Sequence, residues 1–232
     1  MATAYLILAH KLPRQVVRLV KRLSDGGGPV WLHVDRKSRQ LFEPFRGALD
    51  KLGHVTVTSE TNVAWGHVSM LRVMMRGIDV LMRDHPEITH IKHLSGQDFP
   101  LRPPAEFDAF LARYRSASLL EHFAAPFAGW VDGGEPGGGL DRVRYLHCRF
   151  GERVRRIPIP LPLPRGYRLF VGSALWCLCR EHARFVLERS GALYQRLRWA
   201  GHPDEMFFRT ALASSPFAGD LVNNDYTFVK WQ

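Results

Sequence analysis

Two neighbouring carboxylates, Asp204 and Glu205, follow Pro203 in the segment GHPDEMFFRTAL. The pattern predicts a helix start here, where free backbone amides and the helix dipole favour the ionised form of a carboxylate. A general base must be ionised before it can take a proton, so the pair is suited to base chemistry. An acidic pair in a first helical turn is more often only a helix-stabilising feature.

Two other carboxylates follow expected strands. Asp35, in LHVDRKS, stands where a carboxylate can accept hydrogen bonds from a ribose or a base edge, although capping of the next turn is the commoner use. Asp98 stands in HLSGQDFPL, where many sugar transferases carry two aspartates that grip a divalent ion. A single acidic residue cannot supply that pair, and Asp98 could equally bond backbone amides in a turn. We therefore assign no metal.

An aromatic residue and a small-residue pair complete the candidate groups. Trp65 precedes Gly66 in NVAWGHVSMLRVM and could form the wall of a sugar pocket, or fill a gap beside a helix start. Gly172 and Ser173 interrupt the β-rich run LFVGSALWCLC, which indicates either a close approach of backbone to a ligand or a purely structural bulge.

Composition limits the classes of protein that can carry these groups. The 232 residues, 46% hydrophobic and 23% charged, are enough for a sizeable core. The apolar run near the N-terminus is too short for a signal peptide or a membrane span, so we expect a soluble, cytoplasmic protein. The spacing of the three cysteines, Cys148, Cys177 and Cys179, predicts neither disulfides nor a metal site.

The formal net charge of +10 favours an anionic partner, and a diphosphate, nucleic acid or an acidic membrane would all qualify. The arginines are spread along the chain, and no zinc-finger spacing, RNP-like string or long basic tail is present to prefer nucleic acid. We expect no nucleic-acid partner. A peripheral contact with a membrane stays open.

The elements that must position these residues alternate between strand and helix in the first half of the chain. Four strands are expected, and helical stretches lie between them. This alternation predicts a mostly parallel sheet with helices on both faces, whose ligands gather at the carboxyl ends of the strands. The expected strands are Tyr5–Ala9, Val30–Val34, Val55–Thr58 and Ile88–Leu94.

The second half is less regular. A helix is expected near residues 105–114, a strand near Leu119 and a loop over 124–139. The proline-rich segment 153–164 predicts an extended surface strand without ladder hydrogen bonds. Regular structure returns as a bent strand over 167–178 and helices near 181–189 and 203–213.

Taken together and in order, the motifs resemble the core-2/I-branching β-1,6-N-acetylglucosaminyltransferase and peptide O-xylosyltransferase family. The resemblance runs from about Ala4 to the last residue, and it implies one α/β domain over 1–232: a GT-A-like, Rossmann-type mixed sheet flanked by helices. The order of the motifs is much more specific than any one of them. The motifs are ILAHK, LHVDRKS, WGHVS, LSGQDFPL, GSALW, HPDE and the ending TFVKWQ.

The resemblance also implies an activity and roles for residues. The expected enzyme is an inverting, metal-independent glycosyltransferase that moves a sugar, GlcNAc or xylose, from a UDP-sugar to a hydroxyl of a glycan, polysaccharide or glycoconjugate. It needs no cofactor, and Glu205 is the general base. Residues expected to bind the donor are Ala9, His10, Asp35, Trp65, Asp98, Gly172, Ser173 and Lys230. Residues expected to contact the acceptor are Asp204, Arg142 and Arg144, although solvated surface charge is the commoner role for the basic loop 142–156.

The family normally continues past the VKW segment into a stretch that supplies cations for the diphosphate. The sequence stops at Gln232, so we expect a truncated or minimal member, with Lys230 and Arg209 as the candidate cations. Two alternatives stay open. One is a metal-dependent enzyme in which Asp35 and Asp98 converge on one ion; the other is a non-catalytic protein that binds a nucleotide or a glycan.

Overall fold

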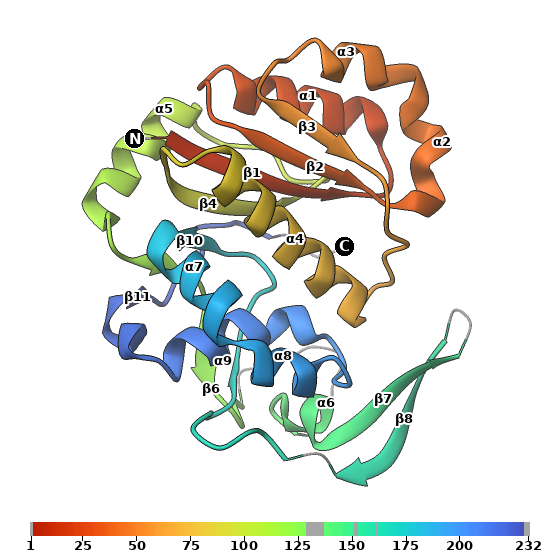
Figure 1. The fold of residues 1–232 in the computed structure, drawn as a ribbon, viewed down its shortest axis with the longest axis vertical. Coiled ribbons are helices and arrows are strands. Elements are labelled where there is room, and N and C mark those ends of the chain that lie inside the picture. Colours follow the sequence, from red (N-terminus) through yellow and green to blue (C-terminus); the bar gives the residue numbers. More distant parts are fainter. Residues whose placement is uncertain (1, 129–136, 151–152, 161, 230–232) are drawn as a thin grey trace. The chain divides into compact units, whose positions relative to one another are not determined.

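A computed structural model describes residues 2–128, 137–150, 153–160 and 162–229 (Figure 1). The chain divides into two compact units, each made of separate stretches of sequence. Unit 1 comprises Met1–Val63, Arg72–Ser116 and Cys177–Arg180. Unit 2 comprises Ala64–Leu71, Ala117–Trp176 and Glu181–Gln232.

Unit 1 contains five strands of a mostly parallel sheet that has helices on both faces. Its strands are hydrogen-bonded in the order β10-β4-β1-β2-β3, all parallel except β10, which is antiparallel to β4. The α/β class and the mixed sheet are therefore confirmed. The strands are β1 (Ala2–Ala9), β2 (Val30–Val34), β3 (Val55–Thr58), β4 (Ile88–Ser95) and β10 (Cys177–Cys179).

The helices of unit 1 follow from its apolar pattern. Helix α1 (Pro13–Ser24) buries side chains at spacings of three and four residues, and these pack on one face of the sheet. On the other face, Gly77 brings helix α4 (Val68–Asp84) close to the sheet, because a Cβ there would lie 2.6 Å from Trp31. The remaining helical segments are η1 (Arg36–Ser38), α2 (Arg39–Phe42), η2 (Glu43–Phe45), α3 (Arg46–Asp50), α5 (Pro104–Leu111) and η3 (Ala112–Tyr114).

Unit 2 has a core built around its helices, and its described strands, apart from the longer Tyr145–Phe150 and Arg153–Pro160, have two residues each. Trp176, Phe207 and Phe208 are fully buried, and the rings of Trp176 and Phe208 lie 4.8 Å apart. The helical segments are α6 (Leu140–Arg144), α7 (Arg180–Arg189), α8 (Gly191–Leu197), η4 (Pro203–Glu205), α9 (Phe207–Ala213) and η5 (Pro216–Asp220). The strands are β5 (Ser118–Leu119), β6 (Phe123–Ala124), β7 (Tyr145–Phe150), β8 (Arg153–Pro160), β9 (Phe170–Val171) and β11 (Leu221–Val222).

Two expectations for this half of the chain are wrong. The proline-rich segment is not an unpaired strand, because β8 pairs antiparallel with β7 in a hairpin that also replaces the expected basic loop. Each strand of a two-stranded ribbon has one open edge, where a proline without an N–H breaks no ladder hydrogen bond. Pro160 stands next to a shift in the register. The bent strand over 167–178 is two separate short strands, β9 and β10.

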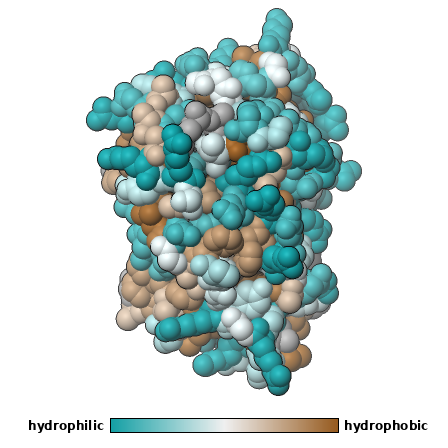
Figure 2. All heavy atoms as spheres, turned by 60° about the vertical axis from the view of Figure 1, so that its left-hand side comes forward, coloured by the Kyte–Doolittle hydropathy of each residue, from teal (hydrophilic) through white to brown (hydrophobic). Residues whose placement is uncertain are grey.

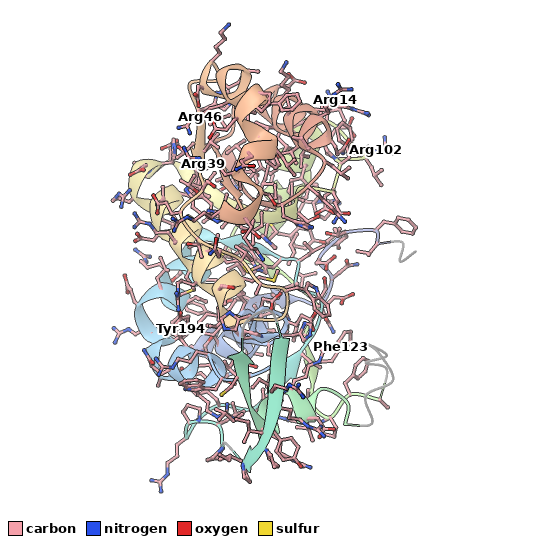
Figure 3. The ribbon with its side chains drawn as sticks, turned by 90° about the vertical axis from the view of Figure 1, so that its right-hand side faces the viewer. Arg14, Arg39, Arg46, Arg102, Phe123 and Tyr194 are labelled. Atoms are coloured by element: carbon pink, nitrogen blue, oxygen red, sulfur yellow. The ribbon has the colours of Figure 1, made fainter. Side chains whose placement is uncertain are left out.

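Hydrophilic and apolar side chains alternate on the part of the surface that Figure 2 shows. Figure 2 shows hydrophilic side chains over most of one face, with apolar side chains in smaller patches between them. In unit 1 the labelled arginines Arg14, Arg39, Arg46 and Arg102 project outward (Figure 3) and are exposed. No helix within the described residues combines the length and the apolar character that crossing a membrane requires.

Candidate functional site

Four of the predicted residues lie at the carboxyl ends of the parallel strands in unit 1. These residues are Ala9, His10, Asp35 and Asp98. The registers place Ala9 level with Val34, and Leu8 level with Ser95, so β1, β2 and β4 end together. The amide of Asp35 donates a hydrogen bond to the carbonyl of Ala9 at 2.8 Å. His10 follows β1 and is exposed; partial loss of hydration, then Lys11, lowers its pKa.

The carboxylate of Asp35 is bonded to the backbone around it. Its Oδ1 accepts hydrogen bonds from the amides of Lys37, at 3.1 Å, and Val63, at 3.2 Å, and its Oδ2 lies 3.8 Å from Lys37 Nζ. Asp35 is only 6% exposed. It therefore caps the turn after β2 and ties that turn to the segment after β3.

Asp98 is also bonded to backbone. Its Oδ2 accepts a hydrogen bond from the amide of Ser95 at 2.7 Å, and its own amide donates to the carbonyl of Ser95 at 3.1 Å. Gly96 is required between them, because a Cβ there would lie 2.9 Å from the Cβ of Ala9. The SGQD segment is thus a tight turn on the end of β4.

In unit 2, the carboxylate of Glu205 lies between two side chains, those of Arg142 and His202. Its Oε2 forms a close, charged hydrogen bond with Arg142 Nη1, and its Oε1 lies 3.7 Å from His202 Nδ1. The side chains of Arg142 and Glu205 are 6% and 15% exposed. An ion pair so far removed from water keeps a carboxylate ionised and oriented.

Trp65 lies against the same cluster. Its ring meets the ring of His202 edge-on, with centroids 4.2 Å apart, yet the side chain is 76% exposed. Gly66 has φ +65°, its carbonyl accepts a hydrogen bond from the amide of His202 at 2.9 Å, and a Cβ there would lie 2.8 Å from the His202 ring. The glycine in WGHVS is therefore needed for the approach of His202, and it leaves a broad aromatic surface in solvent.

Hydrogen bonds of the backbone and of the Arg209 side chain link Gly172 and Ser173 to the segment that contains Asp204 and Glu205. The amide of Gly172 donates to the carbonyl of Glu205 at 3.2 Å. Arg209 is fully buried and donates to the carbonyls of Glu121, at 2.9 Å, of Asp204, at 3.0 Å, and of Ser173. Burial lowers the pKa of Arg209 to about 10, which still leaves it charged at neutral pH.

The expectation that Arg209 could bind the diphosphate is therefore wrong, since its guanidinium is enclosed and bonded to three carbonyls. Sequence reasoning also missed His202 and Glu121. His202 stands directly before the Pro-Asp-Glu segment, a position that could have marked it. Glu121 accepts a hydrogen bond from the amide of Ser173 at 3.3 Å, and no local pattern marked it.

Asp204 and Glu205 occupy different environments although they are neighbours. Asp204 is 3% exposed, and no hydrogen-bond partner is described for its Oδ1. Burial raises its pKa to about 6, partly offset by Arg209 and Arg142. The pair stands on the 3-10 turn η4 rather than in the first turn of an α-helix, because the helical path is interrupted at Met206, with φ −130°, before α9 begins.

The remaining predicted residues do not form one group with those above. Arg144 is exposed on α6, whereas Arg142 of the same helix points to Glu205. Lys230 lies outside the described residues. Cys148, Cys177 and Cys179, which all lie within the described ranges, form no disulfide. Within the ranges given above, no group of three or more His, Cys, Asp or Glu side chains is arranged to hold a metal ion.

A model of the Core-2/I-Branching enzyme family matches residues 3–232. The chain belongs to this family. Xylosyltransferase 2 of Rattus norvegicus is 28% identical over 98% of this chain and 26% of its own length, and xylosyltransferase 1 of Homo sapiens is 27% identical over 98% of this chain and 24% of its own length. This member of the family thus spans about a quarter of the length of these relatives.

Among solved structures, a putative glucose-1-phosphate thymidylyltransferase from Bacillus anthracis superposes with a TM-score of 0.43 and 8% identity, covering 83% of this chain and 78% of that chain. The likeness is weak.

Proposed function

We propose that this family member is an inverting glycosyltransferase that moves a sugar from a UDP-sugar to an acceptor hydroxyl without a catalytic metal ion. The observation that carries the proposal is the carboxylate of Glu205, held by Arg142 in a sparsely hydrated pair beside the exposed ring of Trp65 and His202. Family membership supports sugar transfer as the reaction class.

In the proposed step, the Glu205 carboxylate takes the proton of the acceptor hydroxyl as the hydroxyl oxygen attacks the anomeric carbon. The bond from that carbon to the diphosphate breaks on the opposite side, so the configuration inverts and UDP leaves. Arg142 favours the charged carboxylate that can take the proton, and the pair holds it in one orientation. Arg209 positions this segment through the Asp204 carbonyl.

We propose that unit 1 binds the nucleotide of the donor. Ala9, His10 and Asp35 stand at the carboxyl ends of parallel strands, the usual place for a nucleotide in such sheets. Asp35 Oδ1 already accepts two backbone hydrogen bonds, so this residue would act mainly by shaping the loop. Lone pairs of the carboxylate that are not used in these bonds would accept a hydrogen bond from the ribose. Lys230 remains the candidate cation for the diphosphate.

The names of the relatives make UDP-xylose the first donor to test, followed by UDP-GlcNAc. For the acceptor, we propose a glycan or glycoconjugate hydroxyl. The family resemblance predicts Trp65 at the donor, but it lies against His202 beside Glu205, and its broad exposed ring can stack there on the C–H face of an acceptor sugar. The donor is a substrate, and no cofactor is proposed.

A donor-hydrolysis and transfer screen with UDP-xylose, UDP-GlcNAc, UDP-galactose and UDP-glucose tests the function. We expect turnover with one of the first two that is unchanged by EDTA. UDP should also raise the melting temperature with or without EDTA, because it binds the folded state. Turnover or a thermal shift that requires Mn²⁺ would establish the metal-dependent alternative, and UDP binding without any turnover would establish a binding protein.

A further inference from the structure

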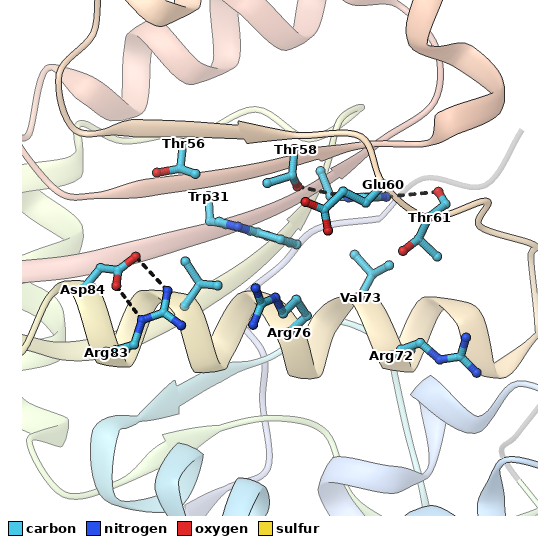
Figure 4. A pocket seen from close by; sticks show the side chains of 12 residues that line it. Trp31, Thr56, Thr58, Glu60, Thr61, Arg72, Val73, Arg76, Arg83 and Asp84 are labelled. Atoms are coloured by element: carbon cyan, nitrogen blue, oxygen red, sulfur yellow. Dashed lines mark hydrogen bonds and ion pairs between the residues drawn. The ribbon is translucent and has the colours of Figure 1, made fainter.

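A cavity of about 420 Å³ lies within unit 1, between helix α4 and the strands β2 and β3, of which β3 is the edge of the sheet (Figure 4). It is formed by side chains of β2 and β3, the turn after β3, and the sheet-facing side of α4. None of the residues proposed above for the nucleotide lines it. The volume falls in the range of small-molecule sites.

The floor of this cavity contains an unsatisfied donor. Trp31 is 2% exposed, and its indole Nε1 has no hydrogen-bond partner among the described residues. In Figure 4 the indole ring lies in the space between β3 and α4. A buried N–H without an acceptor is costly, so such a group in a cavity indicates a missing acceptor.

The rim supplies charges of both signs that remain available. Arg72 and Glu60 form no ion pair within the described parts of the chain, and Arg76 has only Asp79, at 3.4 Å, with both side chains at least half exposed. Such exposed pairs are weak and exchange readily. In Figure 4 the Glu60 carboxylate points from the segment after β3 toward α4, and the Arg76 side chain lies along α4.

We propose that this cavity binds a small, hydroxyl-rich anion, namely a monosaccharide that carries one carboxylate or one phosphate. A guanidinium from Arg72 or Arg76 would hold the anionic group through paired hydrogen bonds. Glu60 would accept from a sugar hydroxyl, the Trp31 N–H would donate to a sugar oxygen, and the walls at Val73 and Val80 would contact the C–H face. All the residues of this site belong to unit 1, and none of them takes part in the proposed transfer of a sugar.

Fluorine NMR of the full chain labelled with fluorotryptophan tests this site, with the Trp31 signal assigned from the Trp31→Phe variant. We titrate glucuronate and glucose 6-phosphate, each with and without saturating UDP. The Trp31 signal should move saturably, and the tighter of the two probes identifies carboxylate or phosphate as the preferred group. Neutral glucose should bind more weakly, because it offers the arginines no charge.

Arg72→Gln and Arg76→Gln should each weaken probe binding about tenfold or more, since each removes a charged hydrogen-bond donor. Arg14→Gln is the matched control, because it removes the same charge from α1, which packs on the opposite face of the sheet. Calorimetric titration of these three variants gives the same comparison if Trp31→Phe does not fold. An unmoved Trp31 signal, equal binding by all three variants, or displacement of the probe by UDP would overturn the proposal.

Discussion

The carboxylates of unit 1 and those of unit 2 are held in different ways. Asp35 and Asp98 accept hydrogen bonds from backbone amides within a few residues or at the next strand end. Glu205 is instead paired with the side chain of Arg142, 63 positions away in the sequence. Carboxylates of the first kind shape loops, whereas the ion pair of the second kind holds a charged side chain in one orientation, as the proposed base chemistry requires. The two kinds should therefore respond differently to substitution.

The largest effect is expected for Glu205→Gln. This change keeps size and most hydrogen bonding but removes basicity, and loss of a general base commonly lowers the rate about 10² to 10⁴-fold. UDP affinity should change little, because the lost interaction is used mainly in the transition state. Steady-state transfer rates and UDP titration measure both quantities.

Glu188→Gln is the matched control for this prediction, because it makes the same chemical change on the exposed side of α7. Its turnover should equal that of the wild type. If Glu205→Gln keeps more than about a tenth of the wild-type turnover, a loss well short of base removal, then Glu205 is not the base.

The next largest effect concerns the ion pair. Arg142→Gln leaves the poorly hydrated Glu205 carboxylate without its cation, and breaking such pairs costs about 3 to 5 kcal/mol of unfolding free energy. Arg142→Lys should recover part of this, because it restores the charge without the guanidinium fork. Urea unfolding of both variants measures the effect.

A double-mutant cycle with Glu205→Gln isolates the pair. The double variant should be less destabilised than the sum of the two single variants, with a coupling energy of about 1 to 3 kcal/mol. Strict additivity would mean that Arg142 and Glu205 do not interact in solution, which would remove the feature that separates unit 2 from unit 1.

Asp204 should have a smaller effect, and one that depends on pH. Its pKa is raised by burial to about 6, so between about pH 4 and pH 6 the folded state holds a proton that the unfolded state releases. Stability therefore falls as pH rises through that window, by about 3 kcal/mol in total. Asp204→Asn should flatten this dependence and raise stability at neutral pH, and unfolding curves from pH 4 to 7 measure it. Parallel wild-type and variant profiles would contradict the raised pKa.

Part of this architecture could be predicted because it is encoded locally. The first strands and the apolar face of α1 follow from runs of apolar residues whose burial needs no knowledge of distant segments. The predicted strands Val30–Val34 and Val55–Thr58 match β2 and β3 in full. The motifs that indicate the family are also short local segments, so the sequence alone was enough to identify it. The family is confirmed.

The rest depends on long-range contacts. Nothing near Arg142 indicates that it pairs with Glu205, and a buried arginine bonded to three carbonyls, as Arg209 is, looks like a surface cation in sequence. The β7–β8 hairpin was missed because prolines suggest an unpaired strand unless both strands are known to be edges. The structure places the predicted site residues that lie within the described ranges, whereas their roles remain predictions that the variants above test.

The smallest effect is expected at Asp35, where the carboxylate is bonded to backbone. Asp35→Ala leaves the amides of Lys37 and Val63 without their acceptor and should lower the unfolding free energy by about 1 to 2 kcal/mol. Asp35→Asn keeps one acceptor oxygen and should fold more like the wild type. If Asp35 also serves the ribose, both variants should bind UDP about three- to tenfold more weakly, the value of one or two hydrogen bonds. Because the asparagine variant preserves the cap, it separates the two roles: weaker UDP binding in a protein of nearly unchanged stability requires direct nucleotide contact. Unchanged UDP affinity in that variant would restrict Asp35 to the turn, and the contrast between backbone-held and side-chain-held carboxylates would then be complete.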